Sequence, residues 1–539
     1  MSTLFTRFRD CAVRHPELPA VEVAGQTVRY RELLDLVERL AGRLAAVAGR
    51  HPAAVGLLAV RSLAAYAGYL AALRLGATVV PLHPELPVAR NARMCRSAGV
   101  DVVVADDAGA VQLATLVAQT GAAALALRSG GGTPWYWSLD TPPLSEPYQG
   151  QPEGIAYTLF TSGSTGEPKG VPIRHRNLDR YLTHCIDRYG VGPGARLAPA
   201  FELTFDGSVF GMFVTWCSGA TLVVPRPEDL LAPARFVTAR QVTHWFSVPS
   251  LVSIAHRQRM LPVAGMPELR WSLFGGEQLT FDQARAWAAA APHSVIENLY
   301  GPTEVTISCT GYRLPADPAY WPATPNGTVP IGPVHPHLEM VVLAEDGLTE
   351  VVPTEGGLTE DGSTRDGPAT ADGELCVRGP QRFDGYLDPA DNQGRFIYVE
   401  AGRARPCDDP VVPGDAWYRT GDRVRVGADG VMVHLGRLDD QVKIRGYRIE
   451  LGEIESVLRE HPKVLDAVAL VSPAGSPALH AVYTGEPVDP AELATLAGER
   501  LPPYMLPAHY RYVDALPVNV HGKVDRRRLT AELGGADLY

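Results

Sequence analysis

Short apolar runs alternate with amphipathic stretches along the first part of the sequence, and this alternation restricts the fold more than any other feature. In residues 30–44 the apolar side chains recur at the spacing of one helix face, with charged residues on the opposite face. Runs typical of strands occupy residues 77–82, 101–105 and 221–224. Strands and helices that alternate in this way form layered sheets with crossover helices. The sequence therefore predicts an α/β fold.

The length, composition and charge exclude several classes of protein. The chain has 539 residues, 46% hydrophobic and 20% charged, as in globular proteins of several domains. Its net charge of −11 argues against a general nucleic-acid-binding protein. The longest nearly uncharged apolar run, residues 62–73, is too short to span a bilayer, and the N-terminus lacks a signal peptide's apolar core. The seven cysteines form no C-x-x-C pair. We expect a cytoplasmic enzyme that binds neither nucleic acid nor membrane.

Two changes along the chain suggest its domain organisation. Residues 345–372 contain eight acidic residues, one arginine and few large apolar ones, so we expect a mobile surface insertion there. After Gly436 a strand-like run at 441–444 precedes an amphipathic helix near residue 454, and the remaining chain suffices for a small α+β domain. The predicted domains are a large N-terminal core at 1–438 and a smaller C-terminal domain at 439–539.

A segment rich in glycine and hydroxyl residues, TSGSTGEPKG at 161–170, follows a strand-like run at 157–160. Its N–H groups and hydroxyls can donate to phosphate oxygens, and glycine lets the backbone approach closely. The segment is not a P-loop, because Pro168 precedes Lys169 and Gly170 follows it. On its residues alone, a phosphate-binding loop and a polar surface turn remain equally open.

Six further signatures, taken in their order along the chain, decide between a phosphate-binding loop and a surface turn. They are FDGS at 205–208, GGE at 275–277, YGPTE at 300–304, YRTGD at 418–422, GRLDDQVKIRG at 436–446 and GKVDR at 522–526. With the loop, this series resembles the adenylate-forming enzymes: acyl-CoA synthetases, luciferases and nonribosomal peptide adenylation domains. The QVKIRG form is similar to the amino-acid adenylation branch. The resemblance implies a large N-terminal domain of sheets and helices with a small C-terminal lid.

The resemblance also implies ATP and Mg²⁺ as cofactors and assigns roles to single residues. Lys523 reaches the substrate carboxylate and the α-phosphate, and Glu304 holds the magnesium ion; with Thr161 they form the implied catalytic set. Tyr300 stacks on adenine, and Asp422 accepts hydrogen bonds from the ribose. The implied nucleotide-binding residues are Thr161, Ser162, Gly163, Ser164, Thr165, Gly166, Lys169, Gly275, Gly276, Glu277, Asn298, Tyr300, Gly301, Thr303, Glu304, Asp422 and Arg437.

Asp206 stands where amino-acid adenylation domains bind the substrate ammonium, and a buried carboxylate without that partner would be costly. Aligned by spacing, the residues around the substrate are Asp206, Gly207, Phe210, Phe246, Leu273, Gly275, Leu299, Ile307, Ser308 and Lys523. This set is almost wholly apolar apart from Asp206 and Lys523, so an apolar or aromatic side chain fits best. A β-amino acid stays open, because its ammonium can also reach Asp206.

The partner implied by the resemblance is a carrier protein with a phosphopantetheine arm, loaded after a lid rotation about the hinge residue Asp439. Only 16 residues follow Lys523, too few for a carrier domain, so we expect a free-standing ligase. The basic residues 526–528 with Arg445 and Arg448 are candidates for a carrier-docking patch. Two alternatives remain: an acyl- or aryl-CoA ligase, against which Asp206 argues, and an inactive homologue that serves as a binding subunit.

Overall fold

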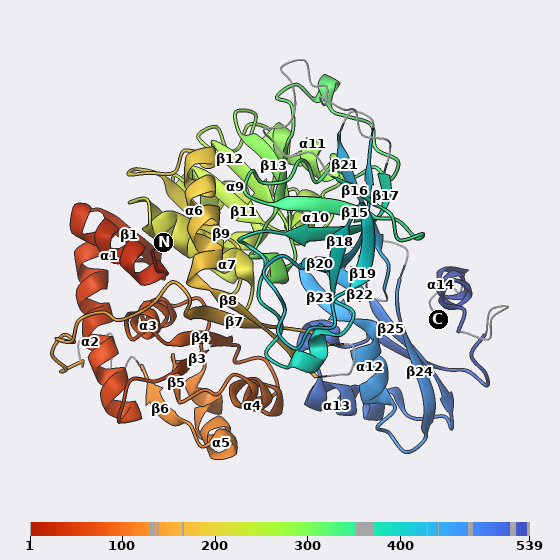
Figure 1. Cartoon of the computed structure of the whole chain (residues 1–539), viewed down its shortest axis with the longest axis horizontal. Coiled ribbons are helices and arrows are strands. Elements are labelled where there is room, and N and C mark those ends of the chain that lie inside the picture. Colours follow the sequence, from red (N-terminus) through yellow and green to blue (C-terminus); the bar gives the residue numbers. More distant parts are fainter. Residues whose placement is uncertain are drawn as a thin grey trace.

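The computed structural model describes residues 2–128, 136, 139–163, 167–351, 371–427, 430–439, 441–472, 478–517 and 524–535. In these residues three large sheets and their helices form the body of the molecule, and a smaller group of elements from the C-terminal part lies against it (Figure 1). The predicted α/β class, with a large N-terminal and a smaller C-terminal part, is confirmed.

The first sheet has six strands in the order β6-β5-β3-β4-β7-β8, parallel up to β7, with β8 antiparallel to β7. Its strands are short and apolar because helices cover parallel sheets on both faces. The runs predicted at 77–82 and 101–105 are β4 and β5, and the predicted helix at 30–44 is α2. The elements are α2 Tyr30–Ala48, β3 Ala54–Leu58, α3 Leu63–Arg74, β4 Thr78–Leu82, α4 Val88–Ser97, β5 Val102–Ala105, α5 Ala110–Thr120, β6 Ala123–Ala126, β7 Ile155–Thr161 and β8 Lys169–Arg174.

The second sheet has eight strands in the order β14-β13-β12-β11-β9-β10-β1-β2. The run predicted at 221–224 is β10. The strands are β1 Pro19–Val23, β2 Gln26–Arg29, β9 Arg196–Pro199, β10 Thr221–Val223, β11 His244–Ser247, β12 Trp271–Phe274, β13 Val295–Tyr300 and β14 Thr310–Arg313. The helices in this part are α1 Leu4–Arg14, α6 His175–Tyr189, α7 Asp206–Trp216, α8 Pro227–Leu231, α9 Pro233–Ala239, α10 Pro249–Arg257 and α11 Phe281–Ala290.

Helix α7 positions the site. Its sequence DGSVFGMFVTW is apolar on all sides, and every residue from Gly207 to Trp216 is buried, as expected for such a helix. Because the helix runs inside the largest hydrophobic core, its first residue, Asp206, is carried into the interior.

The third sheet has the order β16-β15-β17-β20-β18-β19, with β21 on the edge of β20. Its strands are β15 Glu339–Leu343, β16 Thr349–Val351, β17 Ala371–Arg378, β18 Phe396–Glu400, β19 Arg403–Pro406, β20 Trp417–Val426 and β21 Met432–Arg437. Both ends of the expected surface insertion belong to this sheet, because β16 and β17 pair with β15. Residues 352–370, the rest of that insertion, lie outside the described residues.

The C-terminal elements have a core of their own, formed by residues of α12, β24, β25 and α13. They lie at the lower right of Figure 1. The hairpin β22–β23 connects this part to the third sheet, whose last strand ends at Arg437. The elements are β22 Gln441–Ile444, β23 Tyr447–Glu450, α12 Leu451–Leu458, β24 Val464–Val471, β25 Leu479–Gly485, α13 Pro490–Arg500, β26 His509–Tyr512 and α14 Arg526–Gly535.

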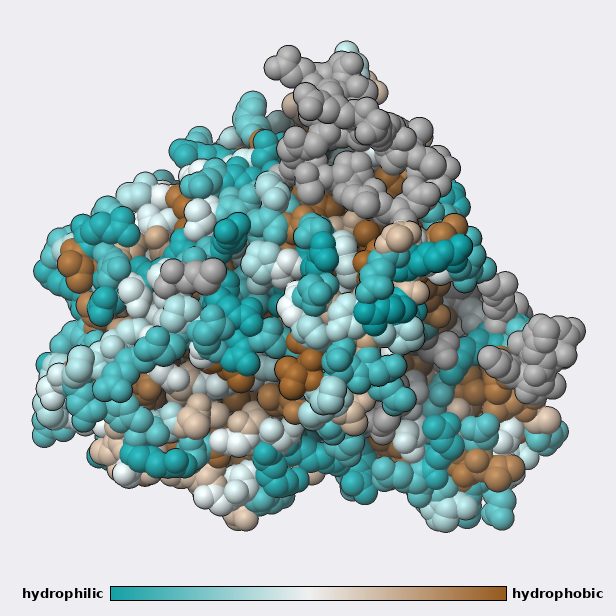
Figure 2. All heavy atoms as spheres, viewed as in Figure 1, coloured by the Kyte–Doolittle hydropathy of each residue, from teal (hydrophilic) through white to brown (hydrophobic). Residues whose placement is uncertain are grey.

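The surface gives no sign of a membrane-spanning element within the described residues. None of the helices there is both long and apolar enough to cross a bilayer. The face seen in Figure 2 is mainly hydrophilic, with separate small groups of hydrophobic residues.

Candidate active site

Two neighbouring cavities, of about 410 and 520 Å³, lie between the body of the molecule and the hairpin β22–β23. Gly276, Leu299, Gly301, Asp422 and Arg437 line both, so the cavities share a wall. The first also extends past Tyr447 and Tyr504 of the C-terminal part. Residues from five of the six signatures, all but GKVDR at 522–526, line the first cavity, although Asp206 and Gly446 are 240 positions apart in the sequence.

Asp422 is the centre of the second cavity's polar wall. It accepts hydrogen bonds from the Tyr300 hydroxyl at 2.6 Å, from His434 Nε2 at 3.0 Å and from Arg437 Nη1 at 3.0 Å. Burial by itself would raise the pKa of Asp422, but the bond from His434 and the charges of His434 and Arg437 lower it well below the ordinary value. The carboxylate is therefore ionised and can accept from hydroxyl groups of a bound molecule.

Asn298 supplies a buried acceptor in the same cavity. Its Nδ2 donates to the carbonyl oxygens of Val329 and Pro330 at 3.1 and 2.9 Å. Its Oδ1 is buried and has no hydrogen-bond partner among the described residues. An unpaired buried acceptor is costly unless a ligand donates to it. The amino group of a purine could donate to this oxygen. The aromatic face of the neighbouring Tyr300 could stack on the purine ring.

The glycine-rich loop lies at the edge of the first cavity. Thr161, at the end of β7, and Ser162 line the cavity, and Ser162 Oγ donates to Arg448 O at 2.8 Å and accepts from the Glu450 N–H at 3.2 Å. Lys169 lies opposite Thr161 in β8, and its Nζ is 2.8 Å from Asp391 Oδ1. Gly163 is described, whereas Ser164, Thr165 and Gly166 lie outside the described residues.

Glu304 is a fully buried carboxylate with charged and neutral donors around it. Arg448 Nη1 lies 3.0 and 2.9 Å from its two oxygens, and the Tyr386 hydroxyl donates to it at 2.7 Å. Burial would raise the pKa of Glu304, but the charge of Arg448 lowers it below the ordinary value. The ionised carboxylate suits a hard divalent cation. In this arrangement its charge is balanced by Arg448 instead.

Asp206 lies in the first cavity. Thr303 and the Gly207 N–H donate to it, and the charge of half-buried Lys443 favours its ionised form. Burial is the larger effect and raises the pKa of Asp206 to about 6. A ligand that brings a positive charge beside this carboxylate would be stabilised by it.

The remaining predicted substrate residues divide into two groups. Gly207, Phe246, Gly275, Leu299, Ile307 and Ser308 line the first cavity with Asp206. Phe210 and Leu273 are not among its described lining residues, and they pack behind Phe246 instead. Phe201, which the sequence did not single out, lines the cavity as well.

A buried glutamine supports the turn that carries Glu304, Ile307 and Ser308. Gln381 Nε2 donates to the carbonyl oxygens of Val305, Thr306 and Ser308 at 3.1, 3.1 and 2.8 Å. These bonds hold Thr306 and Ile307 at φ values of 56° and 74°, a backbone region that L-residues rarely adopt. Sequence analysis missed Gln381, because its partners are about 75 residues away along the chain.

The hairpin β22–β23 docks against the site. The Gly446 N–H donates to Glu277 Oε1 at 2.7 Å, and a Cβ on Gly446 would lie 2.6 Å from Val248 Cγ1. With φ at +82° as well, this position requires glycine. The predicted hinge residue, Asp439, accepts two bonds from Arg437, at 2.6 and 2.7 Å. Lys523 lies outside the described residues.

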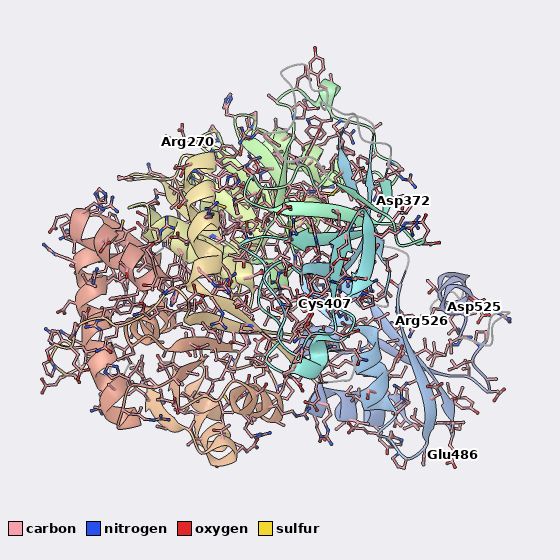
Figure 3. All side chains as sticks on the ribbon, in the orientation of Figure 1. Arg270, Asp372, Cys407, Glu486, Asp525 and Arg526 are labelled. Atoms are coloured by element: carbon pink, nitrogen blue, oxygen red, sulfur yellow. The ribbon has the colours of Figure 1, made fainter. Side chains whose placement is uncertain are left out.

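Arg448 does not belong to a surface patch, contrary to the sequence-based expectation. Its side chain is half-buried and pairs with the buried Glu304. Arg526 pairs with Glu455 at 2.7 Å and donates to Ala469 O at 2.9 Å, beside Asp525 at the outer side of the C-terminal part (Figure 3). Arg528 is exposed and pairs with Glu532. Among the described residues, no group of three or more His, Cys, Asp or Glu side chains could hold a metal ion by itself.

Comparison with known proteins identifies relatives over nearly the whole chain. A family model of the AMP-binding enzyme matches residues 8–387, and a model of the AMP-binding enzyme C-terminal domain matches residues 453–523. The chain is 31% identical to an L-proline–[L-prolyl-carrier protein] ligase of Pseudomonas fluorescens, across 99% of this chain and 100% of that protein.

Larger proteins contain similar segments. The chain is 35% identical, over 98% of its length, to phosphinothricin tripeptide synthetase PhsC of Streptomyces viridochromogenes, of which it spans 45%. It spans a still smaller share of other peptide synthetases, 8% of one and 11% of another. Among solved structures, the adenylation domain AlmE of Vibrio cholerae, in complex with glycyl-adenosine-5'-phosphate, superimposes with a TM-score of 0.81 at 27% identity, with 99% and 98% of the two chains covered.

Proposed function

This chain belongs to the AMP-binding enzyme family, and on that premise we propose that it is an ATP-dependent ligase that activates an amino acid as its aminoacyl-adenylate and transfers it to the phosphopantetheine thiol of a carrier protein. Relatives named for an aminoacyl-carrier ligation and for a glycyl-adenylate complex support both half-reactions.

Asp206 is the observation that carries the proposal. Its carboxylate is enclosed beside the apolar residues Phe246, Leu299 and Ile307, and an enclosed carboxylate is costly unless a cation pairs with it. The ammonium of an amino acid supplies this cation at the place where the substrate must lie, next to Gly207 and Thr303. A simple carboxylic acid, as used by an acyl- or aryl-CoA ligase, would bring no positive charge to Asp206.

In the first half-reaction a carboxylate oxygen of the amino acid bonds to the α-phosphorus of ATP as the bond to pyrophosphate breaks. Asn298 and Tyr300 would hold the adenine and Asp422 the ribose. Glu304 would hold Mg²⁺ beside the phosphates, and the ion would balance charge on the leaving pyrophosphate. Since Arg448 pairs with Glu304 here, Arg448 must withdraw before a cation can bind. Lys523, on the family motif, would neutralise charge at the reacting phosphorus.

In the second half-reaction the thiol sulfur bonds to the carbonyl carbon and AMP departs with the anhydride oxygen, while the thiol proton passes to solvent. The docked hairpin suits this step, because the first cavity extends between the body and Tyr447 and Tyr504. A rotation of the small domain about Asp439 would replace this arrangement with one in which Lys523 faces the active site.

ATP–pyrophosphate exchange tests the proposed function. We expect exchange with at least one amino acid and none with the corresponding acid that lacks the amine. Single-turnover loading of a holo carrier protein should then consume the adenylate, whereas coenzyme A should not replace the carrier. Exchange that is faster with aliphatic or aromatic acids would favour the CoA-ligase alternative, and no exchange with any acid would favour the inactive homologue.

Asp206 should make amino-acid activation depend on pH. Because its pKa is raised to about 6, the carboxyl group of the free enzyme is ionised above that pH and protonated below it. Only the ionised form pairs with an ammonium, so kcat/KM should fall about tenfold per pH unit below about pH 6. Pyrophosphate exchange at subsaturating amino acid measures this profile. The Asp206→Asn variant is the control: an inflection that persists in it would belong to another group.

A further inference from the structure

Building on the proposed function, we propose that the site selects an amino acid with a neutral side chain smaller than that of valine, and that Phe201 sets this limit. The inference deepens the proposed activity by naming its substrate class. It rests on the two phenylalanine rings that close the first cavity beside Asp206.

The Phe201 ring lies directly on the residue that follows Asp206. A Cβ added to Gly207 would be 2.8 Å from two carbon atoms of this ring, so the ring and the Gly207 backbone are already in contact. The backbone holds Phe201 there, since the N–H of the preceding residue, Ala200, donates to Phe246 O at 2.8 Å and extends the pairing of β9 with β11. A substrate whose ammonium reaches Asp206 therefore has its side chain against Phe201.

Phe246 closes the cavity from the next strand. Its ring meets the Phe201 ring edge to face at 4.6 Å between centroids, and it lies 3.4 Å from where a Cβ on Gly275 would be. Both phenylalanines are nearly buried, at 7% and 6% exposure. The glycines at 207 and 275 would by themselves predict a spacious site, but these two rings occupy the space they leave.

The layer behind Phe246 offers no room for a larger side chain. Phe210 packs on Phe246 at 5.0 Å between centroids, and the space between Phe210, Leu273 and Phe246 is about 10 Å³, room for one water molecule at most. Close-packed aromatic rings of this kind resist displacement. An aromatic substrate, which the apolar lining suggested, would have to displace Phe201 or Phe246.

The apolar residues around this part of the cavity also explain why the substrate side chain should be neutral. Phe201, Phe246, Leu299 and Ile307 are apolar, and Ser308 Oγ is bonded to the Tyr181 hydroxyl at 3.0 Å. A charged side chain would lose its hydration without gaining a partner. Glycine, alanine and serine satisfy both the size and the charge conditions.

The test is pyrophosphate exchange with glycine, alanine, serine, valine, leucine and phenylalanine. For the natural sequence we expect kcat/KM for the best of the first three to exceed that for leucine and phenylalanine at least about 100-fold, since a single methylene can change selectivity about 10- to 200-fold. In Phe201→Ala the ratio of leucine to alanine should rise at least about tenfold. Phe201→Leu, a milder change, should shift the ratio in the same direction if Phe201→Ala folds poorly.

Phe213→Ala is the matched control, because Phe213 is an equally buried ring that packs on Tyr69 and Trp216 and does not line the cavity. We expect it to lower Tm while it leaves the leucine-to-alanine ratio within about twofold. A ratio that rises as much in Phe213→Ala as in Phe201→Ala would overturn the role of Phe201. Preference of the natural sequence for valine, leucine or phenylalanine would overturn the size limit yet leave amino-acid adenylation intact. Exchange only with acids that lack an amine would instead overturn the proposed function itself.

Discussion

Asp206→Asn is expected to lower kcat/KM for the amino acid by about 100- to 4,000-fold in pyrophosphate exchange. Removal of one partner of a buried ion pair typically costs about 3–5 kcal/mol, and each 1.4 kcal/mol is about tenfold. The asparagine keeps the size and can still accept from Thr303 and the Gly207 N–H, so packing at the start of α7 should survive. The loss should therefore appear in substrate activation and not in Tm.

The corresponding acid without the amine is the control for this prediction. It places no charge beside residue 206, so its slow activation, where measurable, should be unchanged or faster in Asp206→Asn. Equal losses for the two substrates would mean that Asp206 supports the structure of the site and does not bind the ammonium.

Arg90→Ala is expected to separate the two half-reactions. Arg90, in α4, and Glu453, in α12, form a buried ion pair between the body and the C-terminal part, at 6% and 1% exposure. Without Arg90 the docked arrangement leaves Glu453 buried and unpaired, which costs about 3–5 kcal/mol. Carrier loading from preformed aminoacyl-adenylate should therefore slow at least about 100-fold, whereas pyrophosphate exchange, which uses the other arrangement, should change less than about threefold.

Two further variants isolate the ion pair from other effects. Arg96→Ala, an exposed change in the same helix α4, should leave both half-reactions unaltered. The double variant Arg90→Met/Glu453→Leu removes both charges and should recover much of the loading rate, because it leaves no buried charge unpaired. Loss of both half-reactions in Arg90→Ala, or no recovery in the double variant, would contradict a role for this ion pair in the docked arrangement alone.

Several helices and strands could be predicted from the sequence because nearby residues alone determine them. The helix at α2 and the strands at β4, β5 and β10 each have a periodic or apolar pattern that requires no distant partner. The edges of the acidic segment at 345–372 were misjudged, because residues 349–351 gain their order by pairing with β15 and residues 371–372 by pairing with β20. A composition average cannot show such pairing.

The sequence predicted only those residues of the site that stand in short motifs. Asp206, Tyr300, Glu304 and Asp422 each stand in a signature; Asp206, Tyr300 and Asp422 line the adjoining cavities, and Glu304 follows Thr303, which lines the first. The residues that support or limit them have no motif. Arg448 reaches Glu304 across 144 residues, and Phe201 gains its importance only from its contact with Gly207. These contacts depend on the packing of three sheets, which no local pattern encodes.

The central claim is that a carboxylate oxygen attacks the α-phosphorus of ATP, and isotope transfer tests it most directly. The amino acid that the exchange panel identifies would be labelled with ¹⁸O in its carboxylate and incubated with enzyme, ATP, Mg²⁺ and holo carrier protein, and the products analysed by mass spectrometry. We predict one ¹⁸O atom in the AMP released and none in inorganic phosphate, because the anhydride oxygen leaves with AMP when the thiol attacks. Label in inorganic phosphate, with ADP as the other product, would contradict adenylation and require an acyl phosphate instead.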